Sequence, residues 1–271
     1  MAGSMVSAYL KSVGHRIIEV NRKEVNIFSM ESISRMVYNL EERNVDFIIN
    51  CIGILVKESD LRPDVAVHVN AQFPQFLAHR IKKTHIRLVH LSTDCVFNGT
   101  DGPYDESRVH NEMNYYGRSK SLGEVDNDVD VTFRMSIIGP EKKKDGTGLF
   151  NWFVRNPEEE VNGFTNAWWN GITTLELAKA INHHVSNPKT TGIYNLVPDC
   201  QISKYELLCE INDVFNLNKQ VHPVVFKDGK IINKILIDTR KTFGYDFLEY
   251  REQLVDMKRF MVEYYGFQRA A

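Results

Sequence analysis

The stretch Arg87-Leu-Val-His-Leu-Ser-Thr-Asp94 is an apolar run that opens directly into two hydroxyl residues and a carboxylate. A short continuous apolar run of this kind predicts a strand that is buried on both faces, as strands of a parallel sheet are. Further along, residues 113–125 have a helical pattern and contain Asn114-Tyr-Tyr-Gly-Arg-Ser-Lys120. A buried strand followed by such a helix predicts a βαβ unit, with polar side chains where ligands of open α/β sheets bind.

The same alternation of strand and helix patterns continues on both sides of this stretch. The sequence predicts helices over 4–13, 29–42 and 65–84, and strands over 16–20, 46–51 and 131–138. Beyond Gly139, stretches rich in glycine and asparagine alternate with short helices over 175–185 and 204–215. We therefore predict an α/β fold with a doubly wound (Rossmann) domain in residues 1–139. Residues 140–271 are expected to form mainly a smaller substrate-binding lobe, with segments that return to the first domain.

The composition narrows the class of protein. The chain has 271 residues, 43% of them hydrophobic and 25% charged, with a formal net charge of -2. These values are ordinary for a globular protein, and nothing in them favours a nucleic-acid or membrane partner. The four cysteines have no C-x-x-C pair, and the histidines show no metal spacing, so we expect a reduced, cytoplasmic protein without a metal site.

Tyr116 and Lys120 stand at positions i and i+4 of the predicted helix, so their side chains share one face. A free phenol has a pKa of about 10, and a nearby ammonium lowers that pKa and makes the phenol useful for acid–base chemistry. Thr93 or Ser92, at the end of the strand, would polarise a substrate carbonyl. The structural alternatives are a chance surface pair for Tyr116 and Lys120, and a turn or helix cap for the two hydroxyl residues.

The residues around these positions resemble a known family. Ser92-Thr-Asp-Cys-Val-Phe-Asn-Gly99, Gly102-Pro-Tyr104, and Asn114 to Lys120 with Gly123-Glu124 are similar to the core of the dTDP-4-dehydrorhamnose reductases, which are extended short-chain dehydrogenases/reductases. Val69-Asn-Ala71 also fits this family, and Gly192-Ile-Tyr-Asn-Leu196 with Ile202-Ser-Lys-Tyr-Glu206 resembles its C-terminal lobe. The resemblance covers most of the chain.

The resemblance implies specific roles. It makes Thr93, Tyr116 and Lys120 the catalytic triad, with hydride delivered from a nicotinamide. The residues expected to bind the cofactor are Gly3, Ser4, Met5, Arg22, Asn50, Cys51, Ile52, Gly53, Asn70, Tyr116 and Lys120. The residues expected to bind the substrate are Ser92, Asp94, Cys95, Arg134, Trp168, Trp169 and Asn170. For the two tryptophans, stacking on a base or sugar and burial in the core are equally compatible with the sequence.

Some positions depart from the family pattern. The family usually has tyrosine where Cys95 stands and an aromatic residue where Ile137 stands, so we expect a sugar other than the dTDP-linked rhamnose precursor. Arg22 with Lys23 after the predicted second strand favours the 2′-phosphate of NADP(H), although both residues are equally compatible with a solvated surface and NAD(H) stays open.

The cofactor-binding end lacks part of the family pattern. The family begins with a strand and G-x-x-G-x-x-G, whereas here only Met1-Ala-Gly3 precedes the first helix, so Gly3 matches the last glycine. A central strand buries five or six apolar side chains at roughly 1.5–3 kcal/mol each. We therefore expect the natural chain to begin upstream of Met1 with an apolar strand, the alternative being that another segment fills its place.

The sequence thus predicts an NADP(H)-dependent reductase of a keto group on a nucleotide-activated deoxysugar, of the 4-keto-6-deoxy type. One alternative is an epimerase-reductase acting on the same class of substrate. Another is a non-catalytic, NADP-binding regulatory subunit that resembles the β subunit of methionine adenosyltransferase. The expected partners are a nucleotide sugar and a second copy of the chain in a homodimer.

Overall fold

Four parallel strands form the main sheet of the computed structural model, which describes residues 1–141, 146, 148–226 and 229–265. Their order across the sheet is β1-β2-β3-β8. The strands are β1 (Phe47–Asn50), β2 (Arg87–Leu91), β3 (Val131–Arg134) and β8 (Gly192–Asn195). In register, Ile49 lies beside Val89 and Val89 beside Val131. The predicted parallel α/β fold is confirmed.

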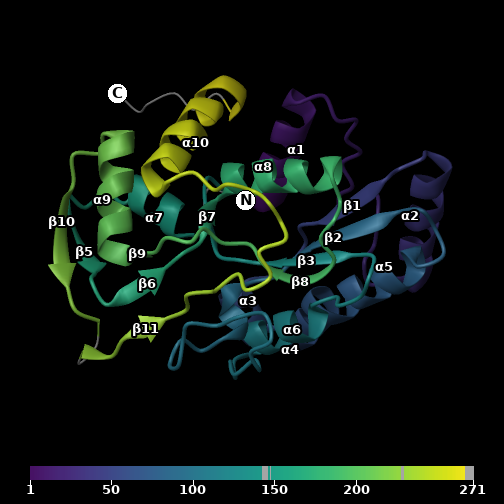
Figure 1. The fold of residues 1–271 in the computed structure, drawn as a ribbon, viewed down its shortest axis with the longest axis horizontal. Coiled ribbons are helices and arrows are strands. Elements are labelled where there is room, and N and C mark those ends of the chain that lie inside the picture. The colour runs from purple at the N-terminus through teal and green to yellow at the C-terminus, as the bar shows by residue number, and fades with distance from the viewer. Residues whose placement is uncertain (142–145, 147, 227–228, 266–271) are drawn as a thin grey trace.

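Helices cover both faces of this sheet because successive strand side chains point to opposite faces. Val89, Val131 and Phe133 form one apolar cluster with α1 (Ala2–Ser12) and α8 (Thr174–Ser186). Leu88 lies in a second cluster with α2 (Met30–Glu42) and α5 (Phe73–Ile81). Figure 1 shows α1 and α8 on one side of the sheet and α5 and α6 on the other. The sheet is therefore the middle layer of three.

The predicted helix over 65–84 forms as consecutive segments. They are α4 (Pro63–Ala66), a π-helical stretch (Val67–Gln72) and α5, and they follow the short helix α3 (Val56–Leu61). The helix α6 (Tyr115–Gly123) packs against the π-helical stretch. This contact brings Asn70 next to the helix that carries Tyr116 and Lys120.

Two strand predictions are wrong in detail. Residues 16–20 pair with no strand in the described part of the chain, so they gain no ladder of hydrogen bonds and form no strand. Ile17 and Ile18 nevertheless pack against the clusters on the two faces of the sheet. The predicted strand over 131–138 is broken, because β3 ends at Arg134 and the following β4 (Ile137–Ile138) pairs with β7 (Ile172–Thr173) instead.

The C-terminal half forms the lobe at the left of Figure 1 and also returns to the main sheet. The Gly192–Asn195 strand, which resembled part of the C-terminal lobe, pairs with β3 in the main sheet. The elements of the lobe are α7 (Leu149–Arg155), β5 (Glu160–Phe164), β6 (Ala167–Trp169), β9 (Ile202–Ser203), α9 (Lys204–Phe215), β10 (Gln220–Val224), β11 (Ile232–Asn233) and α10 (Tyr250–Tyr265). None of the helices in the described residues is long and apolar enough to span a membrane.

Candidate active site

The chain turns sharply where β2 ends, and this turn presents Thr93. A 3₁₀ turn (Asp94–Val96) follows the strand, and the Thr93 hydroxyl caps it by accepting a hydrogen bond from the Cys95 N–H at 3.1 Å. The same Thr93 hydroxyl donates to Asp94 Oδ1 at 3.1 Å. Thr93 and Asp94 are both buried, and Cys95 is half-buried. Thr93 therefore caps a turn, which was the structural alternative for this residue, and it also lies just after the end of β2.

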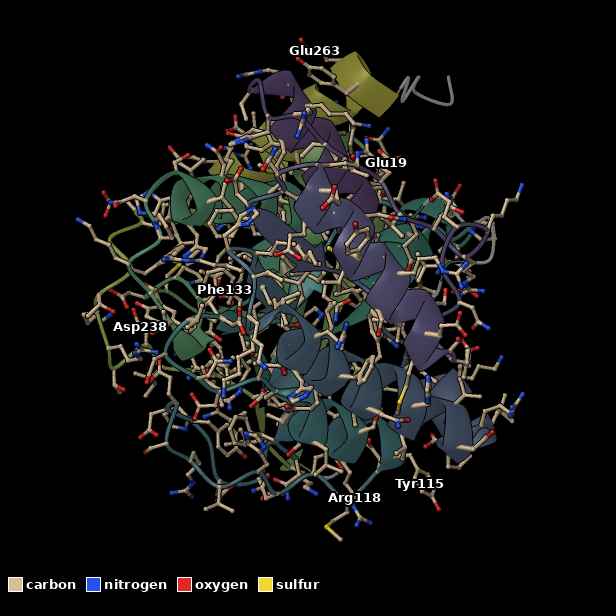
Figure 2. The ribbon with its side chains drawn as sticks, turned by 90° about the vertical axis from the view of Figure 1, so that its right-hand side faces the viewer. Glu19, Tyr115, Arg118, Phe133, Asp238 and Glu263 are labelled. Carbon is tan, nitrogen blue, oxygen red and sulfur yellow. The ribbon has the colours of Figure 1, made fainter. Side chains whose placement is uncertain are left out.

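A glycine brings α6 against this turn. Asn114 caps the helix by accepting from the Gly117 N–H at 2.8 Å. A Cβ on Gly117 would lie 2.4 Å from the Cys95 carbonyl oxygen, so only glycine allows this approach. Figure 2 shows Tyr115 and Arg118 on the outer surface of α6, pointing away from the protein. Tyr116, one residue after Tyr115, is half-buried and hydrogen-bonds with Thr93.

The neighbours of Tyr116 act on its phenol in opposite directions. Burial raises the pKa of Tyr116, the nearby Cys95 and Asp94 raise it further, and the hydrogen bond with Thr93 lowers it. Lowering this pKa makes the phenol a better acid at neutral pH, so Thr93 is a group that favours proton donation.

Lys120 lies on the same helix but its ammonium is bound elsewhere. Its Nζ donates to the Leu91 carbonyl oxygen at 2.6 Å. Burial lowers the pKa of Lys120 to about 8, against the opposing effects of Glu124 and Cys51. The expected tuning of Tyr116 by Lys120 stays a prediction, since the hydrogen bond that lowers the Tyr116 pKa in this structure comes from Thr93.

The residues expected to bind a cofactor come together beside α1. A Cβ on Gly3 would lie 3.2 Å from Cys51 Cβ, so the first turn of α1 touches the chain where β1 ends. Asn50 binds the buried His90 at 3.1 Å and accepts from the Ile52 N–H at 3.1 Å. This arrangement fixes the turn that follows β1.

Asn70 and Gly53 connect that turn with α6. The Asn70 side chain accepts from the Ile54 N–H at 3.0 Å and donates to Ser119 Oγ at 3.1 Å. A Cβ on Gly53 would lie 3.4 Å from Asn70 Oδ1. Asn70 is thus a link between the two halves of the site, with its amide already engaged.

Three other residues expected to bind the cofactor have different surroundings. The Met5 side chain is fully buried in the apolar cluster of the C-terminal lobe, so only its backbone is left for a ligand. Ser4 Oγ donates to the Met1 carbonyl oxygen at 3.1 Å. Arg22 is exposed in a turn in which the Glu24 side chain accepts from the Asn21 N–H. The expected role of Arg22 in binding the 2′-phosphate of NADP(H) stays a prediction.

Four expected substrate residues are bound within the protein itself. Arg134 is fully buried and forms an ion pair with Glu124, which also accepts from Ser92 Oγ at 2.6 Å. The polar groups of Arg134, Glu124 and Ser92 thus bind one another inside the protein. An unpaired charge buried this deeply would be energetically costly. Trp169 is buried and packs against Tyr250, which corresponds to the core alternative.

The Asn170 amide is also engaged, since it donates to the Leu236 carbonyl oxygen at 2.7 Å and accepts from the Leu236 N–H at 3.1 Å. Asp94, Cys95 and the half-buried Trp168 are therefore the expected substrate residues whose side chains stay candidates.

The sequence analysis missed two lysines that lie at this site. Lys204 and Lys234 both act electrostatically on Asp94. Lys204 is the first residue of α9, where a cation opposes the helix dipole. That unfavourable placement, directly after the Ser203 cap, was the available signal.

Comparisons with known proteins show what this chain is similar to. The family model of the RmlD substrate binding domain matches residues 1–230. The chain is 33% identical over 191 residues to the dTDP-4-keto-6-deoxy-D-glucose reductase of Streptomyces niveus, covering 67% of this chain and 64% of that one. It is 22% identical over 218 residues to the methionine adenosyltransferase 2 subunit beta of Bos taurus, covering 75% and 64%. The chain thus spans less than two thirds of the length of these relatives.

A solved structure supports the fold. The dTDP-4-dehydrorhamnose reductase of Bacillus anthracis, solved in complex with NADP, superposes with a TM-score of 0.80 at 21% identity, covering 97% of this chain and 95% of that chain. At this level of identity the match concerns the fold alone.

Proposed function

The chain belongs to the RmlD substrate binding domain family, and on that premise we propose that it is an NADP(H)-dependent reductase of a keto group on a nucleotide-activated deoxysugar. The observation that carries the proposal is Tyr116 hydrogen-bonded with Thr93 at the carboxyl end of β2, with Lys120 on the same helix. The Streptomyces niveus relative is named for the same type of reaction.

The residues around α1 fit a dinucleotide. The first turn of α1 has no side-chain cap, so its backbone N–H groups can bind a pyrophosphate. Gly3 lies against Cys51, so the absence of a side chain lets the first turn of α1 pack closely on the turn after β1. Gly3, Ser4, the Met5 backbone and residues 50–53 would hold the cofactor, with Arg22 at the 2′-phosphate and Lys120 at the nicotinamide ribose. The nicotinamide, when bound, supplies the hydride.

The residues of this chain supply the proton. Tyr116 would donate its phenolic proton to the carbonyl oxygen of the substrate as that oxygen gains negative charge. Thr93 stabilises the phenolate that remains, because a hydrogen bond to the charged form lowers the pKa of the phenol. Asp94, Cys95 and Trp168 would then contact the sugar. The half-buried Cys95 leaves more room than a tyrosine would, in keeping with a sugar other than the rhamnose precursor.

The test is NADPH oxidation with a panel of 4-keto-6-deoxy nucleotide sugars that differ in base and sugar. We expect turnover with at least one of them, and the Tyr116→Phe variant should lose about 10²–10⁴-fold in kcat because general acid catalysis is lost. Its NADPH affinity should stay near that of the wild type.

The matched control is Tyr115→Phe, since Tyr115 is exposed on the outer side of the same helix. A Tyr116→Phe enzyme with more than about half of the wild-type kcat is incompatible with the proposed acid.

The likeness to the Bos taurus β subunit favours a second candidate, a regulatory subunit that binds NADP without turnover. NADPH binding measured by calorimetry, with no oxidation on the whole panel, would select this candidate. An epimerase-reductase differs in the product, and NMR of the reduced sugar would reveal inversion at a neighbouring carbon.

A further inference from the structure

Glu112 holds the backbone that leads into α6. Its Oε1 accepts hydrogen bonds from the Met113 N–H at 2.8 Å and from the Asn114 N–H at 3.2 Å. Its own N–H donates to the carbonyl oxygen of Val96, in the turn after β2, at 3.1 Å. Asn114 is the cap of α6, so the Glu112 side chain fixes the residue from which the helix begins.

The stem of the Glu112 side chain also lies against the first turn of the helix. A Cβ on Gly117 would lie 2.3 Å from Glu112 Cγ and 2.8 Å from Glu112 Cβ, so the two residues pack closely. Gly117 directly follows Tyr116, and the Gly117 N–H donates to the side chain of the Asn114 cap at 2.8 Å. The placement of Glu112 therefore affects the placement of Tyr116.

The second carboxylate oxygen of Glu112 is paired with the C-terminal lobe. Lys234 Nζ lies 3.6 Å from Glu112 Oε2, and the two side chains are only 22% and 16% exposed. Salt and solvent screen a partly buried ion pair less than a pair on the open surface. This pair joins the start of α6 to a segment that lies much later in the chain.

Lys234 comes directly after β11, and β11 pairs with the strand that carries Trp168. In the register of β11 and β6, Asn233 lies beside Trp168. The Asn233 N–H donates to the Gly99 carbonyl oxygen at 3.0 Å, and a Cβ on Gly99 would lie 3.0 Å from Lys234 Cγ. The backbone and the stem of Lys234 are thus both held beside a strand whose half-buried Trp168 is a candidate sugar contact.

We propose that Glu112 and Lys234 are positioning residues whose ion pair holds the start of α6, and with it Tyr116, against the substrate-binding lobe. This inference rests on the proposed function. It gives the C-terminal lobe a part in aligning the proton donor, through two side chains that need not touch the substrate. The ion pair would keep the acid on α6 in a fixed position relative to the candidate sugar contact at Trp168.

The kinetic test is a double-variant cycle. Lys234→Met should lower kcat for reduction by about two- to fivefold, as the loss of a partly exposed ion pair does, with NADPH affinity unchanged. Glu112→Gln removes the charge but keeps an oxygen that can accept from the Met113 and Asn114 N–H groups, so it should lower kcat equally. The variant with both changes should lose no more than either single variant, because all three lack the same pair.

A conservative variant and a control complete the cycle. Lys234→Arg keeps the charge and should retain more activity than Lys234→Met. Lys241→Met is the matched control, since Lys241 pairs with Asp199 on the surface of the protein, and it should leave kcat at the wild-type value. Losses that multiply in the variant with both changes would show that Glu112 and Lys234 act independently, and would overturn the inference.

A measurement that needs no turnover separates this inference from the proposed function. Amide hydrogen exchange is followed by NMR at Gly117 and Arg118, whose N–H groups donate to the side chain and the carbonyl oxygen of Asn114. Exchange at both should be about two- to fivefold faster in Lys234→Met and in Glu112→Gln, and unchanged in Lys241→Met. Exchange at Ile181, on the distant helix α8, is the reference for the whole fold and should not change.

The outcomes of the two measurements are distinct. Unchanged exchange at Gly117 and Arg118 in both variants overturns the inference. Equally faster exchange at Ile181 also overturns it, because the ion pair would then stabilise the whole fold rather than the start of α6. Absence of turnover in the wild type overturns the proposed function, and the exchange measurement still decides whether the ion pair holds α6.

Discussion

At the scale of single residues, the side chains of this site each have competing partners. The Thr93 hydroxyl can donate to Asp94 or support Tyr116. The Lys120 ammonium shares a helix face with Tyr116 but binds the Leu91 carbonyl. The partner of the Thr93 hydroxyl therefore matters for the acid strength of Tyr116, because the hydrogen bond with Thr93 lowers the pKa of that phenol.

Arg22 provides a prediction at this scale. It is exposed, and a charge-assisted hydrogen bond to a phosphate contributes about 1.5–3 kcal/mol. Arg22→Ala should therefore weaken NADPH binding at least about tenfold while NADH binding changes little. Fluorescence titration of both cofactors checks this, with Arg35→Ala as a control because Arg35 pairs with Glu31 on another exposed helix face. An equal loss for both cofactors would remove Arg22 from the 2′-phosphate.

At the scale of elements, α6 is placed by two glycines. Gly117 lets the helix touch the Cys95 carbonyl, and a Cβ on Gly123 would lie 1.8 Å from the Asn70 carbonyl oxygen. One end of the helix thus meets the turn after β2, and the other meets the π-helical stretch. The helix is held at both ends, which fixes Tyr116 against Thr93.

Gly117→Ala should displace the start of α6. The new methyl group would meet backbone as well as the Glu112 side chain, and overpacking of this kind typically costs about 1–3 kcal/mol. We expect a lower free energy of unfolding in urea and a lower kcat, because Tyr116 moves with the helix. Arg118→Ala, on the exposed side, should change neither. A Gly117→Ala protein with wild-type stability and kcat would show that the contact at Cys95 is not restrictive.

At the scale of the whole molecule, a buried polar network joins the two halves of the chain. Arg134 on β3 binds Glu124 through Nε at 2.9 Å and Nη2 at 2.7 Å. Its Nη1 donates to Asn195 on β8 at 3.2 Å, and Asn195 in turn donates to the Tyr104 carbonyl oxygen at 3.2 Å. Arg134, which the sequence predicted to bind substrate, therefore links β3 and β8 inside the protein beneath the site.

Removing Arg134 should leave Glu124 charged and unpaired in the interior. Breaking such a pair typically costs about 3–5 kcal/mol, so Arg134→Met should lower the free energy of unfolding by that amount. Arg134→Met with Glu124→Gln should recover part of the loss, since the uncompensated charge is gone. Urea unfolding measures both, and Arg35→Ala, which breaks an exposed pair, should cost no more than about 1 kcal/mol. An Arg134→Met variant with the wild-type free energy of unfolding would show that the ion pair between Arg134 and Glu124 does not stabilise the protein.

The sequence predicted three of the four strands of the main sheet, β1, β2 and β3, and the helices that alternate with them, because their apolar periodicity is local. It also placed Thr93 and Tyr116 together, since a strand end and the helix after it meet at one edge of a parallel sheet. It did not predict the return of β8, the loss of the strand over 16–20 or the placement of Lys204 and Lys234 near the site. Those features depend on which segments become neighbours in space, as does the burial of Arg134 and Trp169.

The two hydrogen bonds by which Asn170 holds the backbone of Leu236 have a consequence for how this protein is made on the ribosome. Thr93 lies in the turn after β2, and Tyr116 and Lys120 lie on α6, so all three emerge from the ribosome well before Lys234. The segment after Lys234 is held by hydrogen bonds with Tyr104 and Asn170, which lie far earlier in the chain. The candidate catalytic side chains are thus synthesised well before this segment, and a nascent chain completes their surroundings only after the segment has emerged.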